Sequence, residues 1–210
     1  EGIRALRDSG CDIIIDDITY ITEPYFKDGV IAQAVDDVAA SGVNYFTSAG
    51  NFGSRSYEGI FTPMQAPAQY VGVAHDFGGN QNYQKIRFTR GTYTIALQWE
   101  DEFYSIGDGT GAANDLDFYL VDQFGNRLFG FNRDNTDGDP FEIMPFVVKA
   151  TVDAQLIITR KSGTGNVRFK YIIFRGDGTI LDFNQGTGTA IAHANAAGAM
   201  SVGAALYLNT

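Results

Sequence analysis

The segment Thr47-Ser48-Ala49-Gly50-Asn51 has the residue types that could stabilise an oxyanion. It closes a short apolar run with small residues and then presents an amide side chain. Small residues let a ligand backbone approach closely, and an asparagine N–H can donate to a developing oxyanion. The alternative is a strand that ends in an ordinary Gly-Asn turn. These five residues alone do not decide between the two interpretations.

A second candidate is the acidic pair Asp16-Asp17, which directly follows the β-branched run Ile13-Ile14-Ile15. The run lacks alternation, as expected for a strand that is covered on both faces. Open parallel sheets bind ligands outside the carboxyl ends of their strands, so the pair could form the acidic rim of a cleft. A solvated turn explains the same two residues equally well.

Further along the chain, Asp115 and Asp117 flank Leu116 and therefore face the same side of a predicted strand. Together with Asp137 and Asp139 of the following loop, they could hold calcium through oxygen ligands. The loop does not match the EF-hand pattern, and acids in loops are usually just solvated. Calcium is thus the one cofactor that the residues suggest, and none is certain.

Nucleophilic catalysis by this chain alone finds little support. The chain has two histidines, His75 and His193, and neither lies near a serine in a recognisable arrangement. The nucleophile-elbow pattern Gly-x-Ser-x-Gly fails at Ser48, because residue 46 is phenylalanine. We find no complete triad and expect both histidines to be hydrogen-bonded structural residues.

Charge and hydropathy exclude several classes of partner. Fifteen Lys and Arg against 25 Asp and Glu give a net charge of −10, so a nucleic acid would be repelled. The longest apolar run, residues 196–208, is interrupted by glycines and a serine and is shorter than the ~18 residues of a membrane span. The single cysteine, Cys11, excludes an intrachain disulfide.

The elements that would position these residues change character along the chain. Residues 28–41 have helical apolar spacing between strand candidates 13–15 and 43–47, which predicts a βαβ unit. Residues 75–176 contain short alternating runs separated by Gly, Asp and Asn, as in an antiparallel sandwich. A buried-strand pattern returns at residues 199–205. We therefore expect an α/β fold class: a parallel-sheet domain of residues 1–74 and 177–210, interrupted by an all-β, jelly-roll-like antiparallel sandwich at residues 75–176.

Three segments resemble the subtilisin-like serine peptidases, or subtilases. Residues 10–19 look like the family strand that leads into a Ser-Leu-Gly substrate-binding edge, and Ser48-Ala49-Gly50-Asn51 is similar to the Ala-Gly-Asn oxyanion motif. Residues 195–204 resemble the strand ending in Val-Gly-Ala that follows this motif. Their order and spacing fit the family if the middle of the chain is an insertion, which implies a partial subtilisin-like parallel-sheet domain.

The resemblance implies roles for particular residues. Asn51 would be the oxyanion donor, and Ala49 and Gly50 would line one wall of the primary specificity pocket. The residues that would pair with a protein or peptide substrate are Asp17, Ile18 and Thr19. These three replace the usual Ser-Leu-Gly, which leaves the substrate preference open. The family's Asp, His and Ser motifs do not occur between residues 1 and 210, so we expect the chain to be inactive alone.

The middle region resembles bacterial pre-peptidase C-terminal domains, through an Asp-Leu-Asp strand and a glycine turn in residues 115–126. Both resemblances imply a bacterial protein that is secreted or at the cell surface. The first hypothesis is part of a subtilisin-like serine endopeptidase. The alternative is a non-catalytic binding module or pseudo-peptidase whose sandwich binds protein, carbohydrate or calcium.

Overall fold

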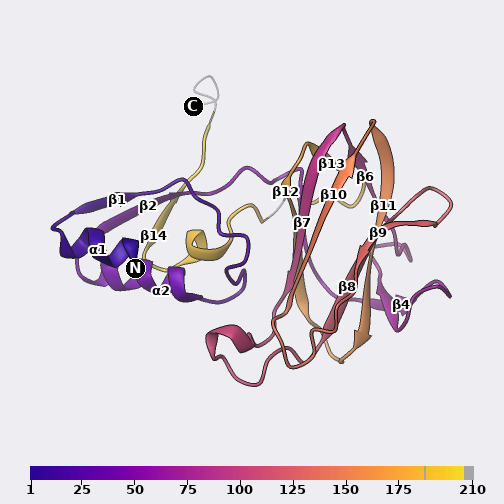
Figure 1. The fold of residues 1–210 in the computed structure, drawn as a ribbon, viewed down its shortest axis with the longest axis horizontal. Helices are drawn as coiled ribbons and strands as arrows, with labels where there is room; N and C mark the ends of the chain where they lie inside the picture. The colour runs from indigo at the N-terminus through magenta and orange to yellow at the C-terminus, as the bar shows by residue number, and fades with distance from the viewer. Residues whose placement is uncertain (187, 206–210) are drawn as a thin grey trace. The chain divides into compact units, whose positions relative to one another are not determined.

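The computed structural model describes residues 1–186 and 188–205 of the chain (Figure 1). Contacts divide the chain into two compact units. The first contains Glu1–Asn51 and Thr189–Thr210, and the second contains Phe52–Gly188. Among the described residues, no helix is long and apolar enough to cross a membrane.

The first unit is a three-stranded parallel sheet with order β1-β2-β14. Its elements, in chain order, are α1 (Gly2–Asp8), β1 (Ile13–Ile15), α2 (Val30–Ala40), β2 (Asn44–Ser48), the 3₁₀ helix η2 (Ala192–Asn195) and β14 (Ala199–Val202). Strand β14 lies beside β2 although the whole second unit separates them in sequence. The resemblance of residues 195–204 to the family strand that follows the oxyanion motif implied this adjacency, and the pairing confirms it.

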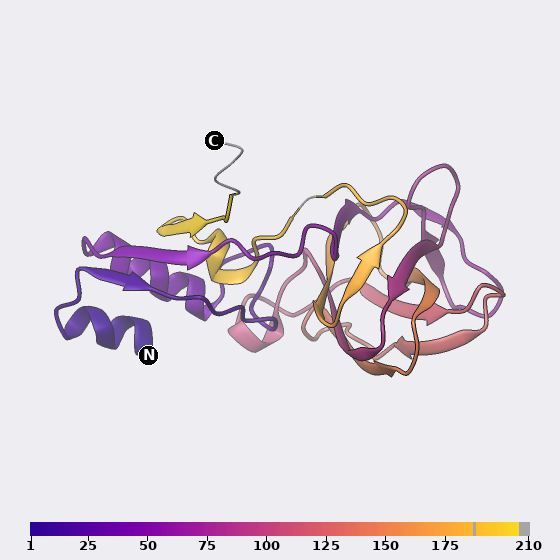
Figure 2. The same cartoon turned by 90° about the horizontal axis from the view of Figure 1, so that it is seen from above.

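The helices of this unit lie on one face of the sheet, as two views show (Figures 1 and 2). Ile14 and Tyr45 point to that face and pack with Val35 and Val38 of α2 in one apolar cluster. Away from the helices, Ile13 and Ile15 are 57% and 75% exposed. Side chains of consecutive strand residues alternate between the faces, which explains why Ile14 is buried between two exposed isoleucines.

The second unit is a sandwich of two antiparallel sheets. One sheet has the order β10-β7-β12-β3. The other contains β13-β6-β11-β5-β4, with β8 paired to β11 and β9 paired to β8. The strands are β3 (Ser56–Ile60), β4 (Pro63–Gln65), β5 (Val73–His75), β6 (Gln84–Phe88), β7 (Gly91–Trp99), β8 (Asp115–Val121), β9 (Arg127–Phe131), β10 (Phe141–Val148), β11 (Val152–Ser162), β12 (Arg168–Arg175) and β13 (Gly178–Ile180), with the 3₁₀ turn η1 (Tyr104–Ile106) between β7 and β8.

Aromatic side chains from both sheets fill the space between them. Trp99, Phe118 and Phe169 are fully buried in one cluster with the branched side chains of β7, β8, β11 and β12. The indole N–H of Trp99 donates to the backbone oxygen of Asn114 at 3.1 Å, so the only tryptophan buries its ring and keeps its polar atom paired.

The expected α/β fold class is wrong. The described chain is mostly β, with 40% strand against 12% helix and two α-helices. Most of its strands are antiparallel and lie in the sandwich. The parallel part has three short strands with helices on one face, and it is not the parallel α/β domain that the resemblance implied.

The unit boundaries also differ from the expected ones. The sequence placed them at residues 74/75 and 176/177, whereas contacts separate the units at 51/52 and 188/189. The physical reason is strand pairing: β3 pairs with β12, β4 with β5 and β13 with β6. Residues that precede and follow the expected insertion are therefore strands of the sandwich.

Candidate functional site

The candidate site lies where the three parallel strands of the first unit end. All three carboxyl ends meet at one edge of the sheet because the strands are parallel. Two backbone hydrogen bonds continue the pairing at this edge: Asp16 N donates to Phe46 O at 3.0 Å, and Ala49 N donates to Val202 O at 3.0 Å. This edge therefore gathers the segments that follow β1, β2 and β14.

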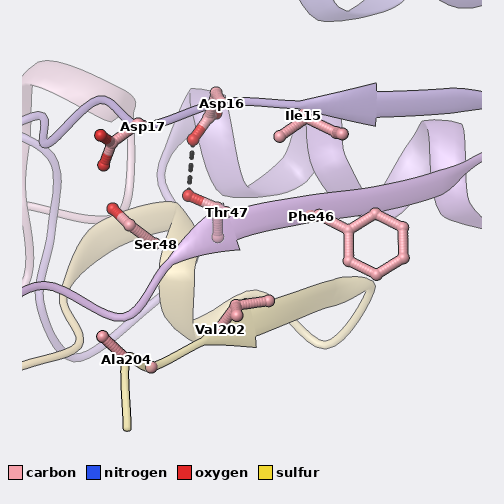
Figure 3. A pocket seen from close by; sticks show the side chains of 9 residues that line it. Ile15, Asp16, Asp17, Phe46, Thr47, Ser48, Val202 and Ala204 are labelled. Atoms are coloured by element: carbon pink, nitrogen blue, oxygen red, sulfur yellow. Dashed lines mark hydrogen bonds between the residues drawn. The ribbon is translucent and has the colours of Figure 1, made fainter. Parts of the chain in front are cut away.

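A hollow of about 500 Å³ opens beside these strand ends (Figure 3). Its apolar wall comes from one side chain of each strand, namely Ile15, Phe46 and Val202. The other lining residues are Asp16, Asp17, Thr47, Ser48, Gly203 and Ala204. The hollow combines a hydrophobic wall with carboxylate and hydroxyl groups.

Asp16 is the centre of a polar network that ties the strand ends together. Its Oδ1 accepts a hydrogen bond from Thr47 Oγ1 at 2.5 Å, and the Tyr45 hydroxyl donates to Oδ2. The Nε2 atom of His193 lies 3.1 Å from Asp16 Oδ2 and 3.2 Å from Thr47 Oγ1. The network thus joins β1, β2 and the 3₁₀ helix before β14.

The network keeps the Asp16 carboxyl ionised. Burial raises its pKa, but hydrogen bonds from Thr47, Tyr45 and His193 outweigh burial and hold the pKa of Asp16 below its ordinary value. Burial and the neighbouring carboxylate raise the pKa of the Tyr45 hydroxyl, so it stays a donor. The other ring nitrogen of His193, Nδ1, is buried and has no hydrogen-bond partner among the described residues.

The contact between Asp16 and His193 was not predicted from the sequence. We expected His193 to be a hydrogen-bonded structural residue, and it is hydrogen-bonded, but to a carboxylate 177 positions away. Both residues lie just outside a predicted parallel strand, and this position in the sequence could have indicated the contact.

We expect Asp16→Asn to destabilise the first unit by about 1–3 kcal/mol, because buried donors on Tyr45 and Thr47 would face an amide that cannot accept at both positions. Thermal unfolding followed by far-UV circular dichroism measures this. Asp17→Asn is the matched control, since Asp17 is exposed and makes no side-chain hydrogen bond among the described residues. Equal melting temperatures for the two variants would show that the network contributes no stability.

The residues proposed from the resemblance lie around the same edge. Asp17 lines the hollow, whereas Ile18, Thr19, Ala49, Gly50 and Asn51 do not. Gly50 has a φ of +74°, a conformation that favours glycine, and it turns the chain after β2 so that the following Asn51 is exposed. Thr189 Oγ1 donates to Ala49 O at 2.8 Å and fastens this turn.

The expected calcium ligands lie in the second unit. Asp115 and Asp117 are buried on β8; Asp115 accepts from Asn135 N at 3.1 Å and pairs with Lys161 at 3.2 Å. Asp139 accepts from Ser105 N, and Asp137 is exposed at the loop tip. In residues 1–186 and 188–205, no three His, Cys, Asp or Glu side chains gather closely enough to hold a metal ion by themselves.

Comparisons with known proteins find no matching family model and no matching curated protein. Solved structures give distant likenesses. The CspB protease of Clostridium perfringens matches with a TM-score of 0.39 and 10% identity, over 99% of this chain and 45% of that one. The arabinose-bound α-L-arabinofuranosidase MgGH51 has a TM-score of 0.26, 8% identity and coverage of 57% and 23%. The infectious bursal disease virus Gx strain structure has a TM-score of 0.25, 12% identity and coverage of 62% and 32%. The chain spans less than half of the CspB structure, and that one distant structural neighbour is a protease.

Proposed function

We propose that this chain is part of a secreted bacterial serine endopeptidase of the subtilisin-like type, in which it supplies the oxyanion donor and a substrate-binding segment. The observation that carries this proposal is the parallel pairing of β2 with β14, in register from Tyr45 with Ala199 to Ser48 with Val202. The Ala-Gly-Asn segment that follows β2 and the Val-Gly-Ala segment at the end of β14 therefore reach the same edge of one sheet.

Asn51 has the chemistry and the exposure that an oxyanion donor needs. Its amide follows a glycine turn at the carboxyl end of β2. When a nucleophile attacks a peptide carbonyl, negative charge develops on the carbonyl oxygen, and a fixed N–H donor lowers the energy of that state. The hydrogen bonds from Ala49 N to Val202 O and from Thr189 to Ala49 O hold the residues just before Asn51.

The segment after β1 is suited to bind an extended peptide. β1 is an edge strand in the order β1-β2-β14, and the backbone of residues 17–19 makes no hydrogen bond to the rest of the described chain. Free backbone donors and acceptors beside a sheet edge can pair with an added strand. In this proposal the nucleophile, base and orienting acid come from other parts of the intact protein.

Peptide hydrolysis by the purified 210-residue chain and by its parent protein tests the proposal. We expect no hydrolysis by the chain, because it holds no complete triad. The parent should cleave an unstructured protein substrate and lose this activity after treatment with a sulfonyl fluoride that modifies an active-site serine.

Two outcomes contradict the proposal. Hydrolysis by the purified chain at the parent's rate would place the chemistry within these residues. A parent that neither cleaves peptides nor reacts with the sulfonyl fluoride would support the non-catalytic binding module instead.

A further inference from the structure

The hollow at the strand ends of the first unit has an apolar wall and a partly polar rim (Figure 3). Each strand supplies one side chain to the wall and, two residues later, one side chain to the rim. These pairs are Ile15 with Asp17, Phe46 with Ser48, and Val202 with Ala204. Residues two positions apart along an extended chain share a face, so the rim continues the wall beyond the ends of the strands.

Asp17 is the acid of this rim whose carboxylate is open to a ligand. Its side chain is exposed and makes no hydrogen bond to the described residues. Asp16 also lines the hollow, but both of its carboxylate oxygens already accept hydrogen bonds, from Thr47 and Tyr45. None of the nine described residues around the hollow is lysine or arginine, so no cation of its lining neutralises Asp17.

A lysine or arginine side chain of a ligand matches this combination of groups. Each has a long aliphatic stem that packs on apolar surface and a cationic head that stays among polar groups. The apolar wall would cover the stem, while the Asp17 carboxylate and the Ser48 hydroxyl would accept hydrogen bonds from the head. An acidic side chain would be repelled by Asp17. The volume of about 500 Å³ lies within the range of about 300–1,000 Å³ that is common for ligand pockets.

We propose that the hollow selects a basic side chain of the peptide substrate and that Asp17 determines this specificity. The inference rests on the proposed function, in which residues 17–19 pair with an extended peptide. Such a peptide directs every second side chain to the face that carries the hollow, so one of them can enter it beside Asp17. Asp17 stands in place of the serine of the usual Ser-Leu-Gly, so the resemblance by itself implies no such preference.

Hydrolysis by the parent protein tests the preference. The probes are otherwise neutral peptides that carry one arginine at successive positions. Each is matched by a peptide with citrulline, which has nearly the same shape as arginine and no charge. We expect kcat/KM to be about tenfold higher for arginine than for citrulline at one position, or at positions two residues apart, because a hydrogen bond to a charged group is stronger than a neutral one. Sodium chloride at about 0.5 M should reduce this ratio.

Two variants show whether Asp17 causes the preference. Asp17→Asn should lower the arginine-to-citrulline ratio to about one, because the amide keeps the size of the side chain and removes its charge. Asp12→Asn is the matched control: Asp12 is exposed and precedes β1 at its opposite, amino end, so this variant should keep the wild-type ratio. A ratio that Asp17→Asn leaves unchanged would refute the site. An equal preference for arginine at every position would also refute it, since a net charge of −10 attracts any cationic peptide.

Binding of the same peptides to the purified 210-residue chain separates this inference from the proposed function. Fluorescence anisotropy of labelled peptides needs no catalysis. We expect the arginine peptide that binds most tightly to have a Kd about tenfold lower than its citrulline partner, and Asp17→Asn to remove the difference.

The two proposals can therefore fail separately. A parent that cleaves peptides without any preference for arginine would keep the proposed function and overturn the specificity of the hollow. A parent that cleaves no peptide would contradict the proposed function, and the anisotropy would then decide about the hollow. Equal binding of the arginine and citrulline peptides would overturn the site, and a difference that depends on Asp17 would support it.

Discussion

Replacing Asn51 by alanine in the intact parent protein is expected to lower kcat by roughly 10²- to 10³-fold and leave KM almost unchanged. The reason is that the amide would donate to the oxygen only when negative charge develops in the transition state. An interaction made only there affects turnover and not substrate binding. Steady-state hydrolysis of a chromogenic peptide over a range of substrate concentrations separates the two constants.

Asn44→Ala is the matched control for this experiment. Asn44 has the same side chain and lies at the opposite, amino end of β2, where it is exposed. It should leave both kcat and KM unchanged. Both side chains are exposed, and the melting temperature of each variant separates a loss of folding from a loss of turnover. A rise in KM without a loss of kcat would show that Asn51 binds substrate and does not stabilise an oxyanion.

The local elements of the first unit could be predicted from the sequence because each has a strong pattern. The isoleucine run 13–15 became β1, the helical spacing at 28–41 became α2, and the expected strand at 43–47 became β2 with a shift of one residue. The pairing of β14 with β2 followed from the resemblance of residues 195–204 to a family segment. Periodicity alone does not predict which strand pairs with so short a strand.

The predicted fold class was wrong because the sequence pattern does not show how many residues belong to each sheet. β3 (Ser56–Ile60) and β4 (Pro63–Gln65) are short and contain glycine or proline, so neither has a clear alternating pattern. Their strand conformation depends on long-range pairing with β12 and β5. Such pairing is a tertiary effect, and it moved residues 52–74 into the antiparallel unit.

Part of the candidate site could be predicted from the order of the strands. The place of Asp17 and Asn51 near one sheet edge follows from strand order, but the contact between Asp16 and His193 depends on the 3₁₀ helix that leads into β14. The burial of Glu142 could also have been predicted from the sequence. Glu142 alternates with Met144, Phe146 and Val148 in β10, and this pattern marks an acid on the inward face of a strand.

Acid should destabilise the sandwich through His75, which is held in its neutral form. Thr62 N donates to Nδ1 at 3.1 Å, so Nδ1 carries no proton, and Nε2 lies 3.2 Å from the Tyr57 hydroxyl. The rings of Phe77 and Phe169 pack edge-on against the imidazole at 4.8 Å. Burial in these surroundings lowers the pKa of His75 to about 4 from an ordinary value of 6.5, although the Asp76 charge opposes the shift.

The sign of the effect follows from proton binding. Between pH 6.5 and about 4 the unfolded chain binds a proton at His75 that the folded chain does not, so stability falls as the pH falls. The slope is about 1.4 kcal/mol for each pH unit, or about 3 kcal/mol across the window. Urea unfolding followed by Trp99 fluorescence at pH 7 and pH 4.5 measures the loss in this unit.

Other groups also titrate in this window, so the diagnostic quantity is a difference between variants. Asp117 and Glu142 have raised pKa values and therefore favour the folded state at low pH, which opposes the effect of His75. His75→Gln removes only the histidine contribution, and its stability should fall less between pH 7 and pH 4.5 than that of wild type. His193→Gln removes the other histidine, which belongs to the first unit, and should leave the Trp99 transition with the wild-type slope. Identical slopes for wild type and His75→Gln would mean that the buried imidazole gains its proton without unfolding the sandwich.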